Sequence, residues 1–561
     1  METSGIEDKR KHLGYLLIIT LSAVLFFIPN LGKVHLFDWD EINFAESARE
    51  MIVTHNYHRV MINFQPFWEK PPLFFWLQTL CMHMFGINEF SARLPNALFG
   101  VITLVTLYLI GRRERNAKFG FFWAISYLGT ILPHLYFKSG IIDPVFNYFI
   151  FTGLYFMYRS LQEPIVRRSM FFIALAGIFI GLSNLTKGPV GLLIFLLSFA
   201  IWFIFKKFRN FPGIKRILIF LLCFSAVTFF WFGTEVIQNG PWFMKEFLAY
   251  QVDLFRTPVA GHQEPVYYHF LVVFLGCFPI SVLALPILFR KGNNMYKNSS
   301  QLAQKPVEKE GDLNLLMKIL FWTVMILFTI VTTKIVHYSS LSYLPLSFIA
   351  CIYIDQILNG RKPSAAILSI VVVTGFIFSF LLSALPLVAQ HPQWLISKLK
   401  DPVAVASLML PVHWTGFEFL IGVVYFLGIL FSVIIIRRKS VQMGFLLLFY
   451  ATATMLFFYL VSVVPKIEAY SQGTVIDFYK SIAGKDVYVT PVAFKSYAHY
   501  YYFAKPGPTK FNEEDSLMTG NIDKPAYFVV KVTNDKFDST CKDCKLIKEG
   551  GGYKFYRREA R

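Results

Sequence analysis

Apolar segments of about 20 residues recur along this chain, each long enough for a helix to cross about 30 Å of hydrocarbon. Charged residues make up 16% of the 561 residues and lie mainly between these segments, while 55% of the residues are hydrophobic. A soluble protein of this size would carry a larger charged fraction. The mean hydropathy of +0.50 agrees with this reading. The sequence therefore predicts a polytopic α-helical membrane protein.

We expect about thirteen transmembrane helices, an odd number that places the two termini on opposite sides of the membrane. The expected helices begin near Leu13, Leu94, Phe119, Val145, Met170, Val190, Ile217, Phe270, Leu315, Ser339, Ala365, Phe417 and Met443.

Lysine and arginine predict the orientation. They precede the first span at Lys9, Arg10 and Lys11 and recur in every second loop, as in Arg112, Arg113 and Arg115. The positive-inside rule puts these loops and the N-terminus in the cytoplasm. The net charge of +19 is then explained by topology, because no aromatic-basic motif suggests nucleic-acid binding. The first span lacks a small-residue cleavage site and is expected to be a retained anchor.

The first extracytoplasmic loop, about residues 30–93, is expected to form two helices along the membrane. The run from Ile42 to Ile52 has apolar residues at helical spacing, and the run from Leu73 to Phe85 is apolar enough to pack on the spans. Around these runs lie ionisable residues, at Asp38, Asp40, Glu41, Glu69 and Lys70, the last two followed by Pro71 and Pro72. Charges held against a membrane are costly and usually functional. Helix capping is the plainer alternative for Asp38 or Asp40 alone.

The last part of the chain changes character, so we divide it into a transmembrane domain at residues 1–464 and a soluble extracytoplasmic domain at residues 465–561. A helix at 468–483 and strands at 486–489, 526–532 and 553–557 predict a small α/β domain. Its Cys541 and Cys544 are expected to form a local disulfide or to stay as two free thiols. The remaining cysteines lie in apolar helices and are expected to pack there.

Several short motifs occur in a characteristic order and on one side of the membrane. They are Asp40-Glu41 after the first span, Glu69-Lys70-Pro71-Pro72, Asp143-Pro144, and Thr186-Lys187-Gly188. In this order the chain resembles the GT-C class of membrane glycosyltransferases, which use polyprenyl-phosphate sugars. It is most similar to the bacterial lipid A aminoarabinose transferase branch, with protein O-mannosyltransferases as more distant relatives.

The resemblance implies a set of site residues. Those matching catalytic positions are Asp40, Glu41, Glu69 and Asp143; those matching donor-phosphate positions are Lys70, Lys187, Arg256, Lys334 and Tyr338; those matching other pocket positions are His262 and Tyr267. Two segments depart from the family pattern. Arg256 follows Phe255 where close relatives carry the arginine before it, and Ile335-Val336 replaces Leu-Pro between Lys334 and Tyr338.

These residue types also suggest a chemistry. Cationic side chains stabilise the charge that develops on a phosphate leaving group, and Asp40 is the candidate general base. One base opposite a phosphate leaving group implies direct displacement with inversion at the anomeric carbon. If the acceptor is itself an ionised phosphate, Asp40 would orient it instead. Asp40 and Glu69 are also candidates to share a divalent metal ion, a question the sequence leaves open.

Nucleotide-binding signatures are absent from the sequence, which has no Walker loop and no dinucleotide glycine fingerprint. A donor already carried across the membrane, a polyprenyl-phosphate sugar, fits an extracytoplasmic site. We expect an inverting glycosyltransferase of the bacterial inner membrane that acts on a lipid such as lipid A, with a periplasmic C-terminal domain. A protein hydroxyl is the alternative acceptor. A transporter or flippase, and a scaffold without activity, are the competing classes.

Overall fold

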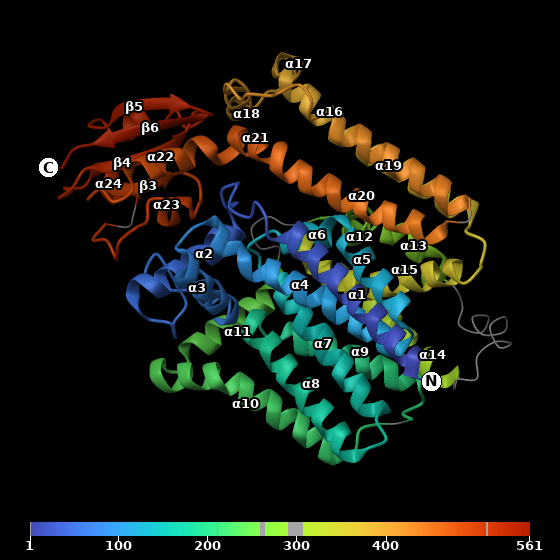
Figure 1. The fold of residues 1–561 in the computed structure, drawn as a ribbon. Helices are drawn as coiled ribbons and strands as arrows, with labels where there is room; N and C mark the ends of the chain where they lie inside the picture. The colour runs from blue at the N-terminus through green and yellow to red at the C-terminus, as the bar shows by residue number, and fades with distance from the viewer. Residues whose placement is uncertain are drawn as a thin grey trace.

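The computed structural model describes residues 2–209, 211–257, 264–289, 307–438, 440–511 and 514–560. Long helices run side by side through the molecule, and the short helices α2, α3 and α11 lie at the same end of this bundle as the C-terminal sheet (Figure 1). The N-terminus lies at the opposite end. We call the end with α2, α3 and α11 the site end.

The helices of the bundle are α1 (Glu2–Phe27), α4 (Glu89–Glu114), α5 (Ala117–Leu128), α6 (Ile131–Phe137), α7 (Asp143–Gln162), α8 (Val166–Lys187), α9 (Val190–Phe205), α10 (Ile214–Asn239), α12 (Tyr268–Gly276), α13 (Ile280–Leu288), α14 (Val307–Ile330), the 3-10 turn η3 (Val336–Ser342), α15 (Tyr343–Leu358), α16 (Ala365–Gln390), α19 (Leu420–Arg437) and α20 (Val441–Ser462). The site end adds α2 (Asp40–Thr54), the strands β1 (Met61–Ile62) and β2 (Gln65–Pro66), α3 (Leu73–Phe85), α11 (Trp242–Arg256), α17 (Gln393–Ile396) and α18 (Pro402–Leu408).

The prediction of a multi-pass membrane protein is confirmed. Within the described residues, nine helices are long and apolar enough to span a membrane, or ten if α12 and α13, bent by 116°, count as one span. The number thirteen stays a prediction. The spans expected near Phe119 and Val190 correspond to α5 and α9, which have only 12 and 16 residues.

Close backbone contact explains how neighbouring spans pair. A Cβ atom on Gly120 of α5 would lie 2.3 Å from the carbonyl oxygen of Tyr108 on α4, so only glycine allows this approach. Helices in a membrane associate largely through such close packing, because lipid tails are as apolar as their side chains.

Both helices expected in the first loop are present. α2 begins at Asp40, with Trp39 in the capping position and no side-chain cap, so the capping alternative for Asp40 is wrong. The Asp38 carboxylate instead accepts hydrogen bonds from the backbone N–H of Tyr497, in the C-terminal part of the chain. α3 begins directly after Pro72, which fits a proline at a helix start.

The C-terminal residues form the expected α/β arrangement. Its elements are α21 (Val464–Glu468), the π-helical turn η4 (Ala469–Gly473), α22 (Thr474–Ile482), β3 (Tyr488–Val492), α23 (Ala498–Tyr501), α24 (Glu514–Thr519), β4 (Ala526–Lys531), α25 (Phe537–Thr540), β5 (Lys545–Gly550) and β6 (Tyr553–Arg558). The sheet has the order β3-β4-β6-β5, with β3 and β4 parallel and the other pairs antiparallel.

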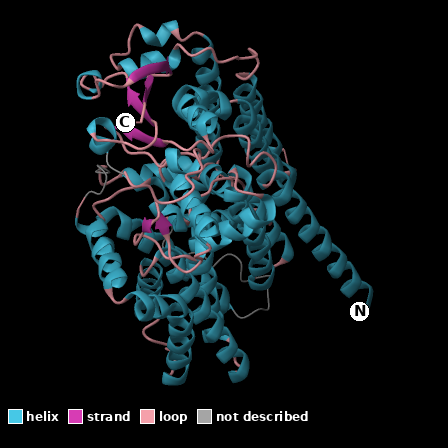
Figure 2. Ribbon diagram, turned by 90° about the vertical axis from the view of Figure 1, so that its left-hand side faces the viewer, coloured by secondary structure: helices cyan, strands magenta, loops and turns pink. Residues whose placement is uncertain are grey.

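Three of these strands were expected, and β5 was missed because its residues are almost all exposed and lack an apolar face. Cys541 and Cys544 form a disulfide, one of the two expected alternatives. The domain boundary at residue 465 falls inside α21 and stays a prediction. Figure 2 shows the four-stranded sheet at one corner of an otherwise helical molecule, apart from the small β1-β2 pair.

The core positions α2 between the bundle and the C-terminal sheet. Ile42, Ala45 and Ala48 of α2 share one apolar cluster with Ile476 and Tyr479 of α22. Phe44 and Met51, from the same helix, belong to a second cluster with residues of α3 and α7. Because both sides of α2 are packed, the position of its first residue, Asp40, is determined by the surrounding helices.

Candidate active site

Four helix ends converge at the site end and bring Asp40, Asp143, Lys187 and His337 together. Lys187, the last residue of α8, lies 2.6 Å from Asp143, the first residue of α7. The Nε2 atom of His337, in η3, lies 3.8 Å from Asp143 Oδ2 and 3.9 Å from Asp40 Oδ2. The Asp40 side chain is 37% exposed, whereas that of Asp143 is 4% exposed. The Asp40 carboxylate is therefore the one that a substrate can reach.

A second set of predicted residues borders this cluster. The Lys70 ammonium group lies 5.1 Å from the ring centre of Tyr250 on α11, and Lys187 lies 5.1 Å from that of Tyr338. The Tyr250 side chain hydrogen-bonds Glu69. Burial lowers the pKa of Lys70, while the nearby Glu69 carboxylate opposes this shift. Burial, reinforced by Glu69, raises the pKa of the Tyr250 hydroxyl.

The ammonium groups of two lysines thus lie among several carboxylates at the site end. Besides Glu69, the charges that act on Lys70 are those of Lys187, Asp40 and Asp143. Such an arrangement offers cations to an anionic leaving group and an accessible carboxylate to an incoming nucleophile. It is the arrangement expected for group transfer from a phosphate.

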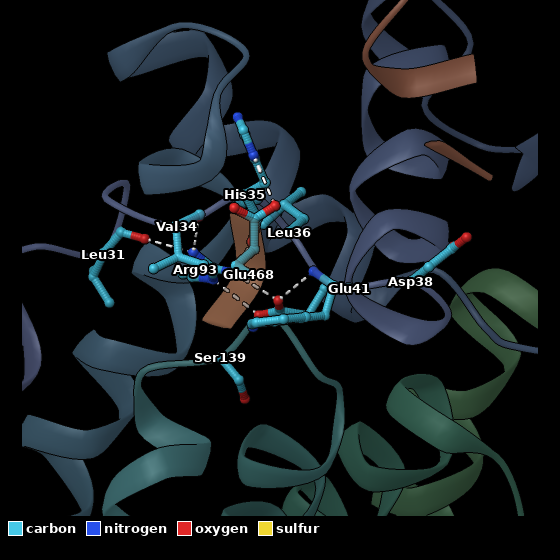
Figure 3. Close-up of polar contacts among 12 residues, drawn as sticks. Leu31, Val34, His35, Leu36, Asp38, Glu41, Arg93, Ser139 and Glu468 are labelled. Atoms are coloured by element: carbon cyan, nitrogen blue, oxygen red, sulfur yellow. Dashed lines mark hydrogen bonds and ion pairs between the residues drawn. The ribbon is translucent and has the colours of Figure 1, made fainter. Parts of the chain in front are cut away.

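Glu41 points to a different place, a buried ion pair with Arg93 of α4 (Figure 3). Arg93 donates from Nη2 to Glu41 Oε2 at 2.7 Å and from Nε to Oε1 at 2.9 Å. The backbone N–H groups of Phe37 and Gly140 also donate to the carboxylate, at 2.9 and 2.5 Å. Burial alone would raise the pKa of Glu41, but Arg93 and these N–H donors hold it below its ordinary value.

Arg93 uses its remaining donors on the first loop. Its Nη1 atom donates to the carbonyl oxygens of Leu31 and Val34 at 2.8 and 2.7 Å, and its Nη2 atom donates to that of His35 at 2.9 Å. With every oxygen and nitrogen of the pair satisfied inside the protein, Glu41 is not brought together with Asp40 and Lys187 but fixes the backbone beside them.

The other predicted residues lie in the surrounding loops. Arg256 is exposed at the end of α11, and Tyr267 is 65% exposed. Lys334 is buried and donates to the carbonyl oxygen of Val331 at 3.1 Å. The Thr333 hydroxyl donates to the carbonyl oxygen of Thr257, which joins the Lys334 turn to the end of α11. His262 lies outside the described residues.

Sequence reasoning missed His337. Its signal was available, because it stands in the same turn as Lys334 and Tyr338. A single histidine in an apolar stretch carries little information without knowledge of what faces it, and its partners are 297 and 194 positions away along the chain.

Few side chains near Asp40 and Glu69 could bind a metal ion. Within the described ranges no three histidine, cysteine or acidic side chains are grouped closely enough to hold one. Asp40 and Glu69 offer two carboxylates, which would suit a hard cation only with oxygens of the substrate as further ligands. Whether Asp40 and Glu69 share a metal ion stays the open question that the sequence posed.

A buried charge network lies further along α2. Glu46 and Arg49 form a two-bonded ion pair at 2.7 Å, and Glu50 Oε2 accepts the backbone N–H of Phe64 at 2.8 Å. Burial, together with the nearby Glu46 carboxylate, raises the pKa of Glu50 to about 8. Lys505 joins this network from the C-terminal part of the chain by donating to Asn63. The network links the first loop to the sheet region.

Comparison with known proteins adds family information. Residues 69–231 match the family model described as dolichyl-phosphate-mannose-protein mannosyltransferase. The undecaprenyl phosphate-alpha-4-amino-4-deoxy-L-arabinose arabinosyl transferase of Wigglesworthia glossinidia brevipalpis is 23% identical over 280 residues, 49% of this chain and 49% of that protein. The aligned part thus spans about half the length of this curated relative.

Solved structures match over nearly the whole chain. ArnT from Cupriavidus metallidurans, in a crystal structure bound to undecaprenyl phosphate, has a TM-score of 0.76 at 17% identity, covering 97% of this chain and 98% of that one. The apo oligosaccharyltransferase of Archaeoglobus fulgidus has a TM-score of 0.50 at 11% identity, covering 94% of this chain and 71% of that one. The expected fold is confirmed by these similarities.

We predict that Arg93→Met strongly destabilises the protein, because it leaves the Glu41 carboxylate buried without its charge partner. Removing one member of a buried pair typically costs about 3–5 kcal/mol. The matched control is Lys480→Met, since Lys480 pairs with Glu89 at the surface with a side chain 44% exposed. Loss of this surface pair is expected to lower the free energy of unfolding by about 0–1 kcal/mol. Thermal unfolding in detergent compares the two, and equal losses would contradict a special role for Arg93.

We also predict a pH effect at Glu50. A carboxyl group with a raised folded-state pKa holds a proton that the unfolded chain releases near 4.5, so it makes stability fall as pH rises from about 4.5 to about 8. Glu50→Gln should remove this component and give a higher melting temperature than the wild type at pH 8 but not at pH 5. Glu559→Gln, on an exposed carboxylate, serves as control. A lower melting temperature of Glu50→Gln at pH 8 would refute the prediction.

Proposed function

We propose that this chain is a membrane glycosyltransferase of the GT-C class and that it moves a sugar from a polyprenyl-phosphate donor to a lipid acceptor, supported by the family match at residues 69–231, the arabinosyl transferase relatives and the ArnT-like fold. The observation that carries the proposal is the meeting of four helix ends, which places Lys187 and Asp143 next to the accessible Asp40 carboxylate. The reaction proceeds on the extracytoplasmic face of the bacterial inner membrane, the side opposite to the basic loops.

Lys70 and Lys187 hold the donor phosphate in this proposal. Both ammonium groups lie against tyrosine rings, Tyr250 and Tyr338, which restricts where they point. Their charges stabilise the phosphate as its bond to the sugar breaks. Arg256 and Lys334, which lie on segments joined through Thr333, are further proposed ligands of the same phosphate. His262 and Tyr267 are proposed to line the surrounding pocket.

The carboxylates have separate roles. Asp40 accepts the proton of the acceptor while the acceptor oxygen attacks the anomeric carbon, and the sugar is inverted because the phosphate leaves from the opposite side. Asp143 holds Lys187 in place through their 2.6 Å ion pair. Glu69 orients Tyr250 beside Lys70. Glu41 is a positioning residue that fixes the start of α2, since its oxygens are all occupied inside the protein.

Two acceptor classes have support. The resemblance of the motifs to the lipid A aminoarabinose transferase branch favours a lipid such as lipid A, and the names of the arabinosyl transferase relatives agree with a donor linked to undecaprenyl phosphate. The family model at residues 69–231 carries the name of a protein mannosyltransferase, which supports a protein hydroxyl as the second candidate.

We predict that Asp40→Asn lowers transfer by about 100-fold to 10,000-fold, the usual contribution of a positioned general base. Proteoliposomes receive labelled polyprenyl-phosphate sugars and a mixed lipid extract, and labelled glycolipid is measured. Asp486→Asn is the matched control, because Asp486 is 80% exposed in the C-terminal part of the chain and should retain full activity. Folded wild-type protein that transfers nothing from any donor, to lipid or to protein, would refute the proposed function.

Removal of divalent ions tests the metal question separately. We expect transfer to persist after treatment with EDTA, because Lys70 and Lys187 already supply positive charge to the leaving group. Loss of transfer on chelation, with recovery on adding Mg²⁺ or Mn²⁺, would contradict this expectation and would show that the enzyme needs a divalent ion, for which Asp40 and Glu69 are the candidate ligands.

A further inference from the structure

Two aromatic side chains beside Asp40 have no role in the mechanism proposed above. Trp39 directly precedes Asp40 and is 43% exposed. Tyr497, from the C-terminal part of the chain, lies against it with the ring centres 4.7 Å apart and the ring planes at 70°. Neither the indole N–H of Trp39 nor the hydroxyl of Tyr497 forms a hydrogen bond to any residue in the described ranges. Each member of this aromatic pair thus keeps a polar group that a ligand can use.

The aromatic pair lies among the acids of the site. The backbone N–H of Tyr497 lies 3.3 Å from each oxygen of the Asp38 carboxylate, to which it donates. Burial raises the pKa of the Tyr497 hydroxyl, and the negative charges of Glu69, Asp38 and Asp40 raise it further. The Tyr497 side chain is therefore close enough to Glu69 and Asp40 to interact with their charges, although it comes from the opposite end of the chain.

The short helix α23 is fixed to the first loop at both of its ends. Tyr497 and Tyr502 flank this helix, and the Tyr502 hydroxyl accepts the backbone N–H of Leu36 at 2.6 Å. The carbonyl oxygen of Leu36 in turn accepts the side-chain amide of Gln472 at 2.8 Å. With Tyr497 bonded to Asp38 at the other end, α23 follows the loop that leads into Asp40. Such support keeps the aromatic pair in one geometry.

The surroundings of the aromatic pair select one part of the donor. Lys70, the proposed ligand of the donor phosphate, follows Glu69 directly, and after burial Glu69 contributes most to the raised pKa of Tyr497. The group bonded to that phosphate can therefore reach Tyr497. The phosphate itself would be repelled by the carboxylates there, and a polyprenyl chain has no polar group to bond them. A sugar ring offers apolar C–H faces to aromatic rings and hydrogen-bond donors to carboxylates.

We infer that Trp39 and Tyr497 bind the sugar of the donor, so that the C-terminal part of the chain supplies one wall of the donor site. This inference rests on the proposed transferase function and assigns the residues that contact the transferred group. The lysines hold the phosphate, and the aromatic pair holds the ring attached to it. The C-terminal part is then a component of the active site as well as a neighbour of the helical bundle.

Ligands that differ only in the sugar test this assignment. Binding to the full chain in detergent is measured for a polyprenyl-phosphate pentose, a polyprenyl-phosphate hexose and polyprenyl phosphate without a sugar. We expect Trp39→Ala and Tyr497→Ala to weaken binding of the preferred sugar-bearing donor about 10-fold and to leave the affinity for polyprenyl phosphate within about 2-fold of the wild type. Lys70→Met should weaken binding of both. Tyr497→Phe, which keeps the ring, should lose less than Tyr497→Ala.

The matched control is Trp394→Ala, because Trp394 of α17 is also an exposed tryptophan, at 56%, but lies in a different loop. Its affinities for all three ligands should equal those of the wild type. Melting temperatures measured without ligand separate a loss of binding from a loss of folding.

Three results would overturn the inference. They are unchanged donor affinity in Trp39→Ala and Tyr497→Ala, equal losses for the donor and for polyprenyl phosphate, and a wild type that binds neither sugar-bearing ligand more tightly than polyprenyl phosphate. In each case the transferase proposal still stands if the wild type transfers sugar in proteoliposomes. Absence of transfer together with sugar-dependent binding that both alanine variants lose would instead refute the transferase proposal and support the sugar site.

Discussion

The buried ion pair between Arg93 and Glu41 sets the geometry of the whole site end. Glu41 directly follows Asp40 at the start of α2, and its Oε1 atom accepts the backbone N–H of Gly140, three residues before Asp143. One carboxylate thereby fixes the distance between the starts of α2 and α7, which carry the two acids of the site. Arg93 ties the same point to α4 and to the backbone at 31–35. A buried pair is tolerated only when all its hydrogen bonds are made, and here they are.

Helix ends then make the charges of the site less costly. Asp40 and Asp143 are the first residues of α2 and α7, where the exposed backbone N–H groups favour negative charge. Lys187 is the last residue of α8, where the carbonyl groups favour positive charge. Groups that would be expensive near a membrane are thus stabilised by the helices that carry them, and the 2.6 Å contact of Lys187 with Asp143 adds to this. The same helices leave Asp40 accessible.

Much of this architecture was predictable from local patterns. The membrane class, the two helices of the first loop and three of the four C-terminal strands follow from apolar periodicity, which local sequence records directly. Apolar periodicity does not predict toward which side of α2 each acidic side chain points. Asp40 and Glu41 are neighbours in sequence, but a turn of 100° per residue on a helix sends one to the site and the other to Arg93. The partners of Arg93 and His337 could not be assigned, because they come from segments far away along the chain.

The central claim is that a single accessible carboxylate, Asp40, acts opposite a phosphate held by Lys70 and Lys187. Its most direct test is the anomeric configuration of the transferred sugar, determined by NMR on product made from a polyprenyl-phosphate donor of known configuration. Direct displacement at this site gives a product of inverted configuration. Retention would contradict the account, because it requires a carboxylate that first forms a bond to the sugar, and then the division of roles between Asp40 and the lysines would be wrong.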